Sequence, residues 1–397
     1  MDRPRLILVN RVYWPATAAT AQLLTDLAEG LAARGWAVHV IAAGDISTHH
    51  NGVAIHRTGG NEHHGGMLSR LANFTQFRRA AQRQLATLLQ PGDVVIAMTD
   101  PPLLGAAVAK TAAARGAKLV HWVQDIYPEI ATVHFGPVAG ALLGRLRARR
   151  DAAWRGARRC VTLGEDMARI LASRGVPGDQ ITVLPNWAPR ELDQPASAEA
   201  IATRRAAWGL AGKFVVAYSG NLGRVHEFAA VLVAAQQLRD RPDIVFLFIG
   251  TGARFEEIRT AAQRGLDNVR LLPPEPRENL PAALAAADAQ LVTLKSEYAG
   301  LVYPSKLAGV LAAGRPVLFV GPPHGEIARL LEREHCGEAF GPNEGPRLAA
   351  EIVRWAADPV RRQEAGRRAR VAYEKQFTFA TALANWENLL LTRLARP

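Results

Sequence analysis

Short apolar runs alternate with longer amphipathic stretches along the first half of the chain. The first apolar run, 5–10, has the continuous pattern of a buried strand, and apolar residues then recur at helical spacing over 20–34 before Gly35. Further strands are predicted at 38–43, 93–98, 117–123, 158–163 and 181–184. Helical patterns fall between most of these strands, and this alternation predicts a doubly wound α/β domain with a parallel sheet.

A polar segment rich in proline and alanine, 191–212, breaks this pattern. The strand pattern restarts at 213–219, and further strands are predicted at 244–249, 269–272, 289–294 and 316–320. Helices are predicted at 227–239, 253–263, 278–287, 304–313, 325–332, 345–357, 359–376 and 379–394. The chain is therefore predicted to hold two Rossmann-like domains, 1–190 and 213–378, joined by the linker 191–212.

Two Rossmann-like domains predict an interdomain cleft lined by the carboxyl ends of both sets of strands. Ligands bind at such ends because helix N-termini and glycine-rich turns present amide N–H groups there, so the active site is expected in this cleft. The length of 397 residues also suggests two domains, and the 49% hydrophobic and 21% charged content is ordinary for a globular protein.

Composition also bears on where the protein works. No apolar run is long enough to span a membrane, and the first residues lead straight into a strand, so no signal peptide is expected. The two cysteines, Cys160 and Cys336, lie far apart without metal-ligand spacing and fit a reducing compartment. These features predict a cytoplasmic protein.

The net charge of +12 would suit nucleic acid, an anionic membrane or phosphorylated substrates as partners. Arginines interleave with apolar residues after the loop 59–66, and seven arginines fall within 141–159. Both segments resemble basic amphipathic helices that could lie on an anionic bilayer, or domain helices whose apolar faces pack on the sheet. Packing accounts for most of the apolar residues, which leaves the excess arginine for a membrane or a pyrophosphate. His63 and His64 have no partner at metal spacing and are interpreted as loop residues.

The stretch 300–317 contains a lysine in an unusual place. Pro304 suits the first turn of a helix, and Ser305 and Lys306 then lie in that turn. A lysine is disfavoured at the positive end of the helix dipole unless an anion is bound there. The stretch therefore predicts a phosphate site at Lys306, and the alternative is a solvated lysine at a helix start.

Two glycine-containing turns follow strands of the second domain. Gly220 and Gly223 permit a tight turn with close ligand approach, and Arg224 places a cation where a diphosphate could sit. Gly250 repeats the pattern after the next strand. Either turn could instead be an ordinary βα turn that needs a positive φ, and the absence of G-x-G-x-x-G gives no support for a dinucleotide site.

The first domain offers candidates at the ends of two strands. Asp125 follows the strand 117–123, at the end where catalytic groups collect, or it is a cap or turn residue before Pro128. The turn 13–20 is built of small residues, and its Thr17 and Thr20 could bind sugar hydroxyls or cap the following helix.

Several motifs occur together and in order along the chain. They are Gln-Asp-Ile-Tyr-Pro-Glu at 124–129, Ser-Gly-Asn-Leu-Gly at 219–223, Gly-Thr-Gly at 250–252 and Pro-Ser-Lys-Leu at 304–307 with Ala-Gly-Arg-Pro-Val at 313–317. With these motifs the chain resembles glycosyltransferases of the GT-B fold. It is similar to family 4, in the subgroup of bacterial O-antigen, capsule and exopolysaccharide assembly, and the resemblance covers essentially the whole chain.

The resemblance implies that the second domain binds a nucleotide-sugar donor, usually a UDP-sugar. It assigns the diphosphate to the turn 220–223 with Arg224 and Lys306, the base to the loop 272–275, and the donor sugar to 298–301. The implied donor-binding residues are Gly220, Asn221, Gly223, Gly250, Leu272, Pro273, Tyr298, Gly300, Leu301, Ser305 and Lys306.

The resemblance also places the acceptor in the first domain, to which the C-terminal segment 379–397 commonly returns. The implied acceptor-side residues are Thr17, Thr20, Gln124 and Asp125, and the implied catalytic residues are Asp125, Arg224 and Lys306. No metal or other cofactor is expected. The chain departs from the family at one point, because Leu301 and Gly309 stand where many members carry two glutamates.

The expected function is that of a metal-independent retaining glycosyltransferase, which passes a hexose from a UDP-linked donor to a glycan or a polyprenyl-diphosphate-linked acceptor. It would act in surface polysaccharide synthesis, in the cytoplasm or peripherally on the inner face of the plasma membrane, and nucleic acid is not an expected partner. Two alternatives remain open: a non-hydrolysing sugar-nucleotide 2-epimerase of the same architecture, and a catalytically inert sugar-nucleotide-binding partner.

Overall fold

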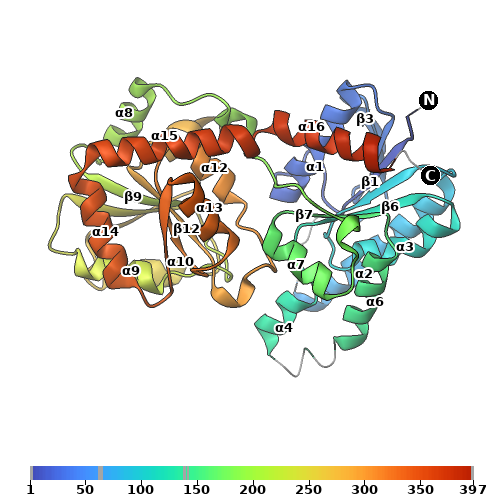
Figure 1. The fold of residues 1–397 in the computed structure, drawn as a ribbon, viewed down its shortest axis with the longest axis horizontal. Coiled ribbons are helices and arrows are strands. Elements are labelled where there is room, and N and C mark those ends of the chain that lie inside the picture. Colours follow the sequence, from blue (N-terminus) through green and yellow to red (C-terminus); the bar gives the residue numbers. More distant parts are fainter. Residues whose placement is uncertain (1–2, 61–65, 137–139, 141–142, 395–397) are drawn as a thin grey trace. The chain divides into compact units, whose positions relative to one another are not determined.

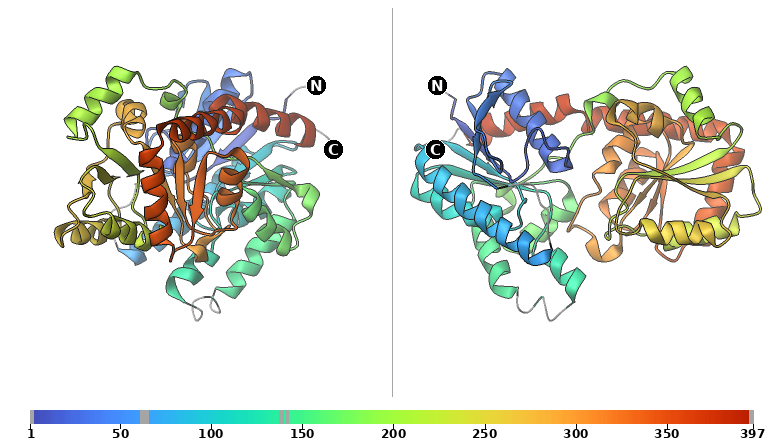
Figure 2. Two further views of the ribbon diagram at one scale, coloured as in Figure 1. Left: turned by 60° about the vertical axis from the view of Figure 1, so that its left-hand side comes forward. Right: turned by 180° about the vertical axis from the view of Figure 1, so that it is seen from behind.

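The computed structural model describes residues 3–60, 66–136, 140 and 143–394, and the chain divides into two units (Figure 1). The first unit comprises Met1–Pro185, Gly300–Tyr303 and Ala382–Pro397, and the second comprises Asn186–Ala299 and Pro304–Thr381. Each unit has its own sheet with helices on both faces (Figure 2). The loop histidines His63 and His64 lie outside the described residues.

The first unit contains an eight-stranded sheet in the order β3-β4-β2-β1-β5-β6-β7-β8. Its strands are β1 (Leu6–Val9), β2 (Val38–Ala42), β3 (Thr48–His50), β4 (Val53–Arg57), β5 (Val94–Ala97), β6 (Lys118–Val123), β7 (Arg159–Thr162) and β8 (Ile181–Val183). Neighbouring strands pair in parallel, except that β3 and β4 are antiparallel. The predicted doubly wound parallel sheet is confirmed, with a hairpin added at one edge.

The hairpin of β3 and β4 was not predicted. Thr48–His50 is polar and largely exposed, so it shows no apolar alternation. The turn between the strands is Asn51-Gly52, in which both residues have a positive φ, as a two-residue hairpin turn requires. This Asn-Gly pair is the sequence signal that marks the hairpin.

The helices of the first unit pack their apolar faces on the sheet. They are α1 (Ala19–Ala33), α2 (Met67–Leu88), α3 (Leu104–Ala114), α4 (Glu129–Phe135), α6 (Gly144–Arg155), α7 (Glu165–Ser173) and the 3-10 turn η1 (Gly178–Gln180). Phe77 and Leu85 of α2 and Trp154 of α6 are buried, which confirms that these basic helices pack on the domain. Leu71 and Leu146 on the same helices stay exposed. Among the described residues, no helix has the length and apolar character needed to cross a bilayer.

The C-terminal segment is part of the first unit from Ala382 onward. It consists of α16 (Phe379–Leu389) and a π-helical turn, η5 (Leu390–Leu394). Trp386 packs edge-on against Trp122 of β6 with ring centroids 4.9 Å apart. Glu387 accepts hydrogen bonds from Arg34 at 2.7 Å and from Trp36 at 3.1 Å. Aromatic packing and charged hydrogen bonds thus hold this segment against the first sheet.

The second unit contains a six-stranded parallel sheet in the order β11-β10-β9-β12-β13-β14. Its strands are β9 (Phe214–Ser219), β10 (Ile244–Ile249), β11 (Val269–Leu272), β12 (Ala289–Thr293), β13 (Val317–Val320) and β14 (Gly337–Phe340). Its helices are α8 (Ala198–Ala207), α9 (Ala229–Gln237), α10 (Phe255–Gln263), α11 (Leu280–Ala285), α12 (Lys306–Ala312), α13 (Glu326–Glu334), α14 (Gly345–Ala357) and α15 (Pro359–Gln376). The strand order reverses between β9 and β12, and ligands bind at the carboxyl ends of strands at such a point.

The predicted linker, 191–212, is counted in the second unit. It contains the regular helix α8, which is capped by Ser197. The Ser197 hydroxyl accepts a hydrogen bond from the Ala200 amide at 3.1 Å. Arg205 of α8 pairs with Asp288 at 3.0 Å and donates to the carbonyl of Ala286 at 2.7 Å. The segment is therefore a packed element of the unit and not an extended connection.

Candidate active site

Lys306 lies at the carboxyl edge of the second sheet, beside the turn that follows β9. Its Nζ contacts the Tyr218 hydroxyl, lies 3.9 Å from the centroid of the Tyr218 ring, and is 3.3 Å from His226 Nε2. Tyr218 is near the end of β9, and His226 follows the glycine turn. The reversal of strand order next to β9 brings these three residues together, although they are distant in sequence.

The hydrogen bonds around Lys306 fix the direction of each donor. His226 Nδ1 lies 2.8 Å from the carbonyl of Thr293, which can only accept, so Nδ1 carries the proton and Nε2 accepts from the lysine. The Tyr218 hydroxyl donates to the carbonyl of Asn221 at 2.8 Å and therefore also accepts from Lys306. The amine is held in one place by two neutral acceptors and an aromatic face.

No carboxylate forms an ion pair with Lys306 in the described part of the chain. Burial lowers the pKa of Lys306 to about 7, and no neighbouring acid counters that effect. Burial, followed by the charge of Lys306, lowers the pKa of His226 to about 3, so this imidazole stays neutral at physiological pH. The site holds an ammonium group whose charge has no partner, and such a group is stabilised by a bound anion.

Three glycines shape the turn beside Lys306. A Cβ on Gly250 would lie 2.1 Å from the carbonyl oxygen of Gly220, and one on Gly252 would lie 2.6 Å from that of Leu222. The Leu222 amide in turn donates to the Thr251 carbonyl at 2.8 Å. The two glycine turns are thus packed on each other, which explains Gly250 and Gly252 by backbone approach within the protein. A Cβ on Gly220 would lie 3.4 Å from Lys306 Cε, so Gly220 makes room for the lysine.

The other predicted diphosphate and sugar residues of this unit lie around the same turn. Asn221 and Arg224 are exposed, and Gly223 lies between them. Burial raises the pKa of Tyr298, and the charge of Arg224 acts against this rise, which places Arg224 near that ring. Ser305 is exposed and makes no capping hydrogen bond to α12. The predicted diphosphate residues Gly220, Asn221, Gly223, Arg224, Ser305 and Lys306 are therefore gathered in one unit.

The predicted base loop is fixed by contacts of its own. The Leu272 carbonyl accepts from the Gly250 amide at 3.0 Å, so the loop starts directly beside the second glycine turn. Pro273 is exposed. Glu275 accepts from Arg204 of α8 and from Asn279, both at 3.2 Å. The prolines of this loop indicated its stiffness from the sequence alone. The contact of Glu275 with Arg204, which lies in the predicted linker, was not predicted.

Gly300 and Leu301 belong to the first unit and not to the donor unit in which they were predicted to act. Leu301 is only 8% exposed, and its carbonyl accepts from the Ile126 amide at 2.9 Å. A Cβ on Gly300 would lie 2.8 Å from Ile170 Cδ1, and its φ is +71°. Packing and turn geometry account for both residues, and the contact of Leu301 with a donor sugar stays a prediction.

Asp125 lies just beyond β6, where Asp125 and Val302 form an isolated antiparallel bridge. Burial, together with the charge of Asp100, raises the pKa of Asp125 to about 6. Asp100 itself is paired with Arg11 at 2.8 Å. The next helix, α4, has Pro128 at its N-cap, so the interpretation of Asp125 as a helix cap is wrong. Gln124 precedes it and is buried.

A cavity of about 460 Å³ lies at the carboxyl ends of β1, β2 and β4 in the first unit. Arg57, at the end of β4, donates to the Ala43 carbonyl at 2.7 Å and also to the Trp14 carbonyl. Thr17 is exposed and Thr20 is half-buried next to this turn. Helix α1 begins at Ala19 with Ala18 at its N-cap, so neither threonine caps it.

The position of the missing second family glutamate has a structural explanation. A Cβ on Gly309 would lie 3.3 Å from Leu192 Cδ1 and 3.7 Å from Leu284 Cδ1. A side chain at this position of α12 would require Leu192 to move by a few tenths of an ångström. Glycine at this position thus allows close packing of Leu192 on α12.

Sequence reasoning missed three residues that shape these sites. Tyr218 and His226 flank the turn motif 219–223, but only the fold shows that both contact Lys306. Arg57 was missed because β4 itself was not predicted. Within the described residues, no group of His, Cys, Asp or Glu side chains could hold a metal ion.

Residues 19–187 match the family described as Glycosyl transferase 4-like domain, and residues 201–372 match Glycosyl transferases group 1. Together with the two doubly wound domains, these matches define the class. The chain belongs to the GT-B glycosyltransferases that combine these two domains.

Individual relatives agree with this family. The chain is 33% identical to WcaI of Escherichia coli (strain K12), named as a colanic acid biosynthesis glycosyl transferase, over 175 residues, which are 43% of this chain and 42% of that protein. It is 29% identical to WbjE of Pseudomonas aeruginosa, named as a glycosyltransferase, over 275 residues, 68% of this chain and 67% of that protein. The aligned region therefore spans less than half of WcaI.

Solved structures share the fold at low sequence identity. Anabaena Alr3699/HepE in complex with UDP has a TM-score of 0.73 and 17% identity, covering 97% of this chain and 99% of that chain. Sucrose-phosphate synthase from Thermosynechococcus elongatus has a TM-score of 0.77 and 18% identity, covering 98% of both chains.

Proposed function

We propose that this protein is a retaining glycosyltransferase that uses a nucleotide-sugar donor and acts in bacterial surface polysaccharide synthesis. One observation carries the proposal: Lys306 is a half-buried lysine without a carboxylate partner among the described residues, placed at the switch point of the second sheet. A diphosphate supplies the missing negative charge. WcaI is named as a colanic acid biosynthesis glycosyl transferase, which supports a role in polysaccharide synthesis. HepE was solved in complex with UDP-glucose, which supports a nucleotide-sugar donor.

In the proposed mechanism, Lys306 and Arg224 stabilise the leaving diphosphate. As the bond between the sugar and the diphosphate opens toward an oxocarbenium-like state, negative charge grows on the departing oxygens. A fixed cation in a site of low polarity stabilises that charge more than it stabilises the intact donor. Tyr218 and His226 hold the Lys306 amine in position, so they act as positioning residues. The reaction so described uses side-chain cations in place of a metal ion.

On the acceptor side, we assign Asp125 to the reacting hydroxyl. With a pKa raised to about 6 by burial and by the charge of Asp100, its carboxylate is a stronger base than an exposed aspartate and is still mostly ionised at neutral pH. The cavity of Arg57 and the exposed Thr17 are the proposed sites for sugar groups of the acceptor. The proposed acceptor is a glycan or a sugar linked to polyprenyl diphosphate.

The direct test is incubation with a panel of UDP-sugars and a polyprenyl-diphosphate-linked sugar. We expect a glycosylated lipid in which the transferred sugar keeps its anomeric configuration, as read by NMR. Asp125→Asn is expected to lower kcat while the affinity for the nucleotide stays unchanged. Release of a 2-epimer of the donor would support the epimerase instead, and tight nucleotide binding without any turnover would support an inert binding protein.

A further inference from the structure

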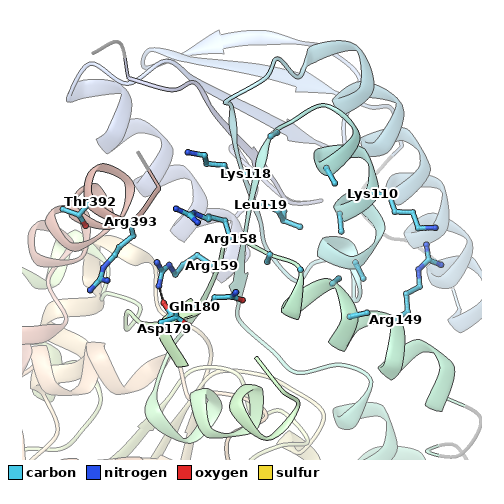
Figure 3. A pocket seen from close by; sticks show the side chains of 18 residues that line it. Lys110, Lys118, Leu119, Arg149, Arg158, Arg159, Asp179, Gln180, Thr392 and Arg393 are labelled. Carbon is cyan, nitrogen blue, oxygen red and sulfur yellow. Dashed lines mark hydrogen bonds between the residues drawn. The ribbon is translucent and has the colours of Figure 1, made fainter. Parts of the chain in front are cut away.

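A large cavity lies in the first unit at the amino ends of β6 and β7, the edge of the sheet opposite to Asp125 (Figure 3). Its volume is about 820 Å³, and it extends between α3, α6, the start of these strands and η5. The cavity exists because its walls are built of the smallest side chains. These are Ala106, Ala109, Ala113, Ala117, Ala152, Ala153, Gly156 and Ala157.

The charged side chains of this cavity are almost all cations. Six basic residues and one acidic residue line it: Lys110, Lys118, Arg149, Arg158, Arg159, Arg393 and Asp179. Figure 3 shows Arg158, Arg159 and Arg393 on one flank and Lys110 and Arg149 on the other. The six cations come from helices, strands and the C-terminal turn, so the fold and not a single run of sequence concentrates them.

Arg159 is the most buried of these cations, with 8% of its surface exposed. Its guanidinium donates to the carbonyl of Asp179, while its Nε is buried without a hydrogen-bond partner among the described residues. Burial, and then the charges of Arg393 and Arg158, lower the pKa of Arg159. The arginine is thus held against like charges, a cost that a bound anion removes.

Three exposed cations at the cavity are also unpaired. In the described part of the chain, no hydrogen bond or ion pair holds the side chains of Lys110, Arg149 and Arg393. Burial, and then the charge of Arg149, lower the pKa of the neighbouring Arg78. Some exposed arginines elsewhere pair with carboxylates, as Arg367 does with Glu364 at 2.8 Å. The cavity differs from the rest of the arginine-rich surface because it gathers its cations around the buried Arg159.

We propose that this cavity is a second anion site, which binds the phosphate group of a ligand other than the sugar donor. Guanidinium groups suit phosphate because they donate paired hydrogen bonds in a fixed plane, and a phosphate ester carries enough charge to engage several cations at once. The alanine walls leave space for an uncharged or apolar remainder of the ligand. The phosphate can come from a soluble phosphorylated molecule or from a phospholipid headgroup.

Binding is measured in a Lys306→Gln background, so that the proposed donor lysine does not contribute and a failure of either site is seen separately. The cavity variant adds Lys110→Gln, Arg149→Gln and Arg393→Gln to this background. The matched control adds Arg83→Gln, Arg264→Gln and Lys375→Gln, which removes three exposed charges outside the cavity. Thermal unfolding of all three proteins checks that each is folded.

In the soluble arm, calorimetry with inorganic pyrophosphate is expected to show binding that the cavity variant weakens by about tenfold or more. The control variant is expected to weaken it by less than about twofold. In the lipid arm, flotation is compared between phosphatidylcholine vesicles and vesicles that also contain phosphatidylglycerol. Flotation with the anionic vesicles that only the cavity variant loses identifies a lipid headgroup as the source.

Pyrophosphate binding without such flotation identifies a soluble ligand, and either result supports the site. Two results overturn the proposal. The first is that neither pyrophosphate nor anionic vesicles bind. The second is that the cavity variant and the control variant weaken binding equally, which would mean that the overall positive charge is responsible.

Discussion

Two cations of this protein, the buried Arg150 in the first unit and the half-buried Lys306 in the second, have opposite surroundings. Arg150 is 4% exposed, and its guanidinium donates to Glu129 at 2.9 Å, to Asp151 at 2.6 Å and to the carbonyl of Tyr127 at 2.7 Å. It also lies 4.0 Å above the ring of Trp154. Lys306 has an aromatic face and two neutral acceptors but no carboxylate in the described part of the chain.

This difference separates a structural cation from a ligand-binding one. The chain supplies the anions for Arg150, so the charge is neutralised on folding and stabilises the contact between α4 and α6. For Lys306 the chain supplies only the position, and the anion has to come from outside. Carboxylates of the fold offset the cost of burying the charge of Arg150. For Lys306, a bound ligand has to offset that cost.

The largest effect is expected from removing Arg150. Arg150→Met removes the cation paired with Asp151 and leaves Glu129 with only the longer contacts to Arg147 and Arg174, both at 3.3 Å. Breaking a buried ion pair from one side costs roughly 3–5 kcal/mol of the free energy of unfolding. Lys306→Met removes a charge that has no partner and is expected to change that free energy by less than about 1 kcal/mol. Urea unfolding of both variants measures the difference. Equal destabilisation would contradict the distinction between the two cations.

A smaller effect is expected from Gly250, whose turn packs on the Gly220 turn beside Lys306. Gly250→Ala would place a Cβ 2.1 Å from the Gly220 carbonyl, at a φ of +142°. The strain and the shift of the turn should cost roughly 1–3 kcal/mol of stability and weaken nucleotide binding as well. Gly265→Ala is the matched control, because Gly265 also has a positive φ but faces open space.

The comparison of these two glycine variants is made by urea unfolding and nucleotide titration. Gly265→Ala is expected to lose some stability but no nucleotide affinity. If Gly250→Ala keeps full nucleotide affinity, then the packing of the two glycine turns does not position the lysine.

The smallest effect is expected in the number of protons that the protein takes up when it binds a diphosphate. Free Lys306 has a pKa of about 7 and is mostly neutral at pH 8, while a bound diphosphate favours its charged form and raises that pKa. Binding at pH 8 should therefore take up close to one proton, and affinity should fall as the pH rises above 7. Calorimetry in buffers of different ionisation enthalpy measures this uptake. Arg150 is paired before the ligand arrives, so it contributes no such proton, and an uptake that persists in Lys306→Gln would contradict the assignment.

The architecture was predictable because parallel strands buried on both faces read as continuous apolar runs. β10 is apolar at all six positions, and its predicted range coincides with the observed one. The β3–β4 hairpin was missed because β3 is polar and exposed at the sheet edge, where no apolar pattern marks it. Its Asn51-Gly52 turn was the available signal.

The candidate site was predictable only in part. A lysine opening a helix after Pro304 marked Lys306 from local chemistry alone. Its contacts with Tyr218 and His226 depend on which strands are neighbours in the sheet. The spacing of apolar residues along the sequence does not reveal that order. The segment 300–303 shows the same limit, because only the fold reveals that Leu301 pairs with the first unit.

Titration of UDP against Lys306→Gln by calorimetry tests the central claim most directly. Loss of one charge-assisted interaction, worth roughly 1.5–3 kcal/mol, predicts an affinity about 10- to 100-fold weaker than that of the unsubstituted protein. Lys213→Gln is the control, since Lys213 lies at the amino end of β9 and donates to the Pro242 carbonyl at 2.8 Å. It should bind UDP normally. Unchanged affinity in Lys306→Gln, or equal losses in both variants, would contradict the role of Lys306 as the cation that holds the donor diphosphate.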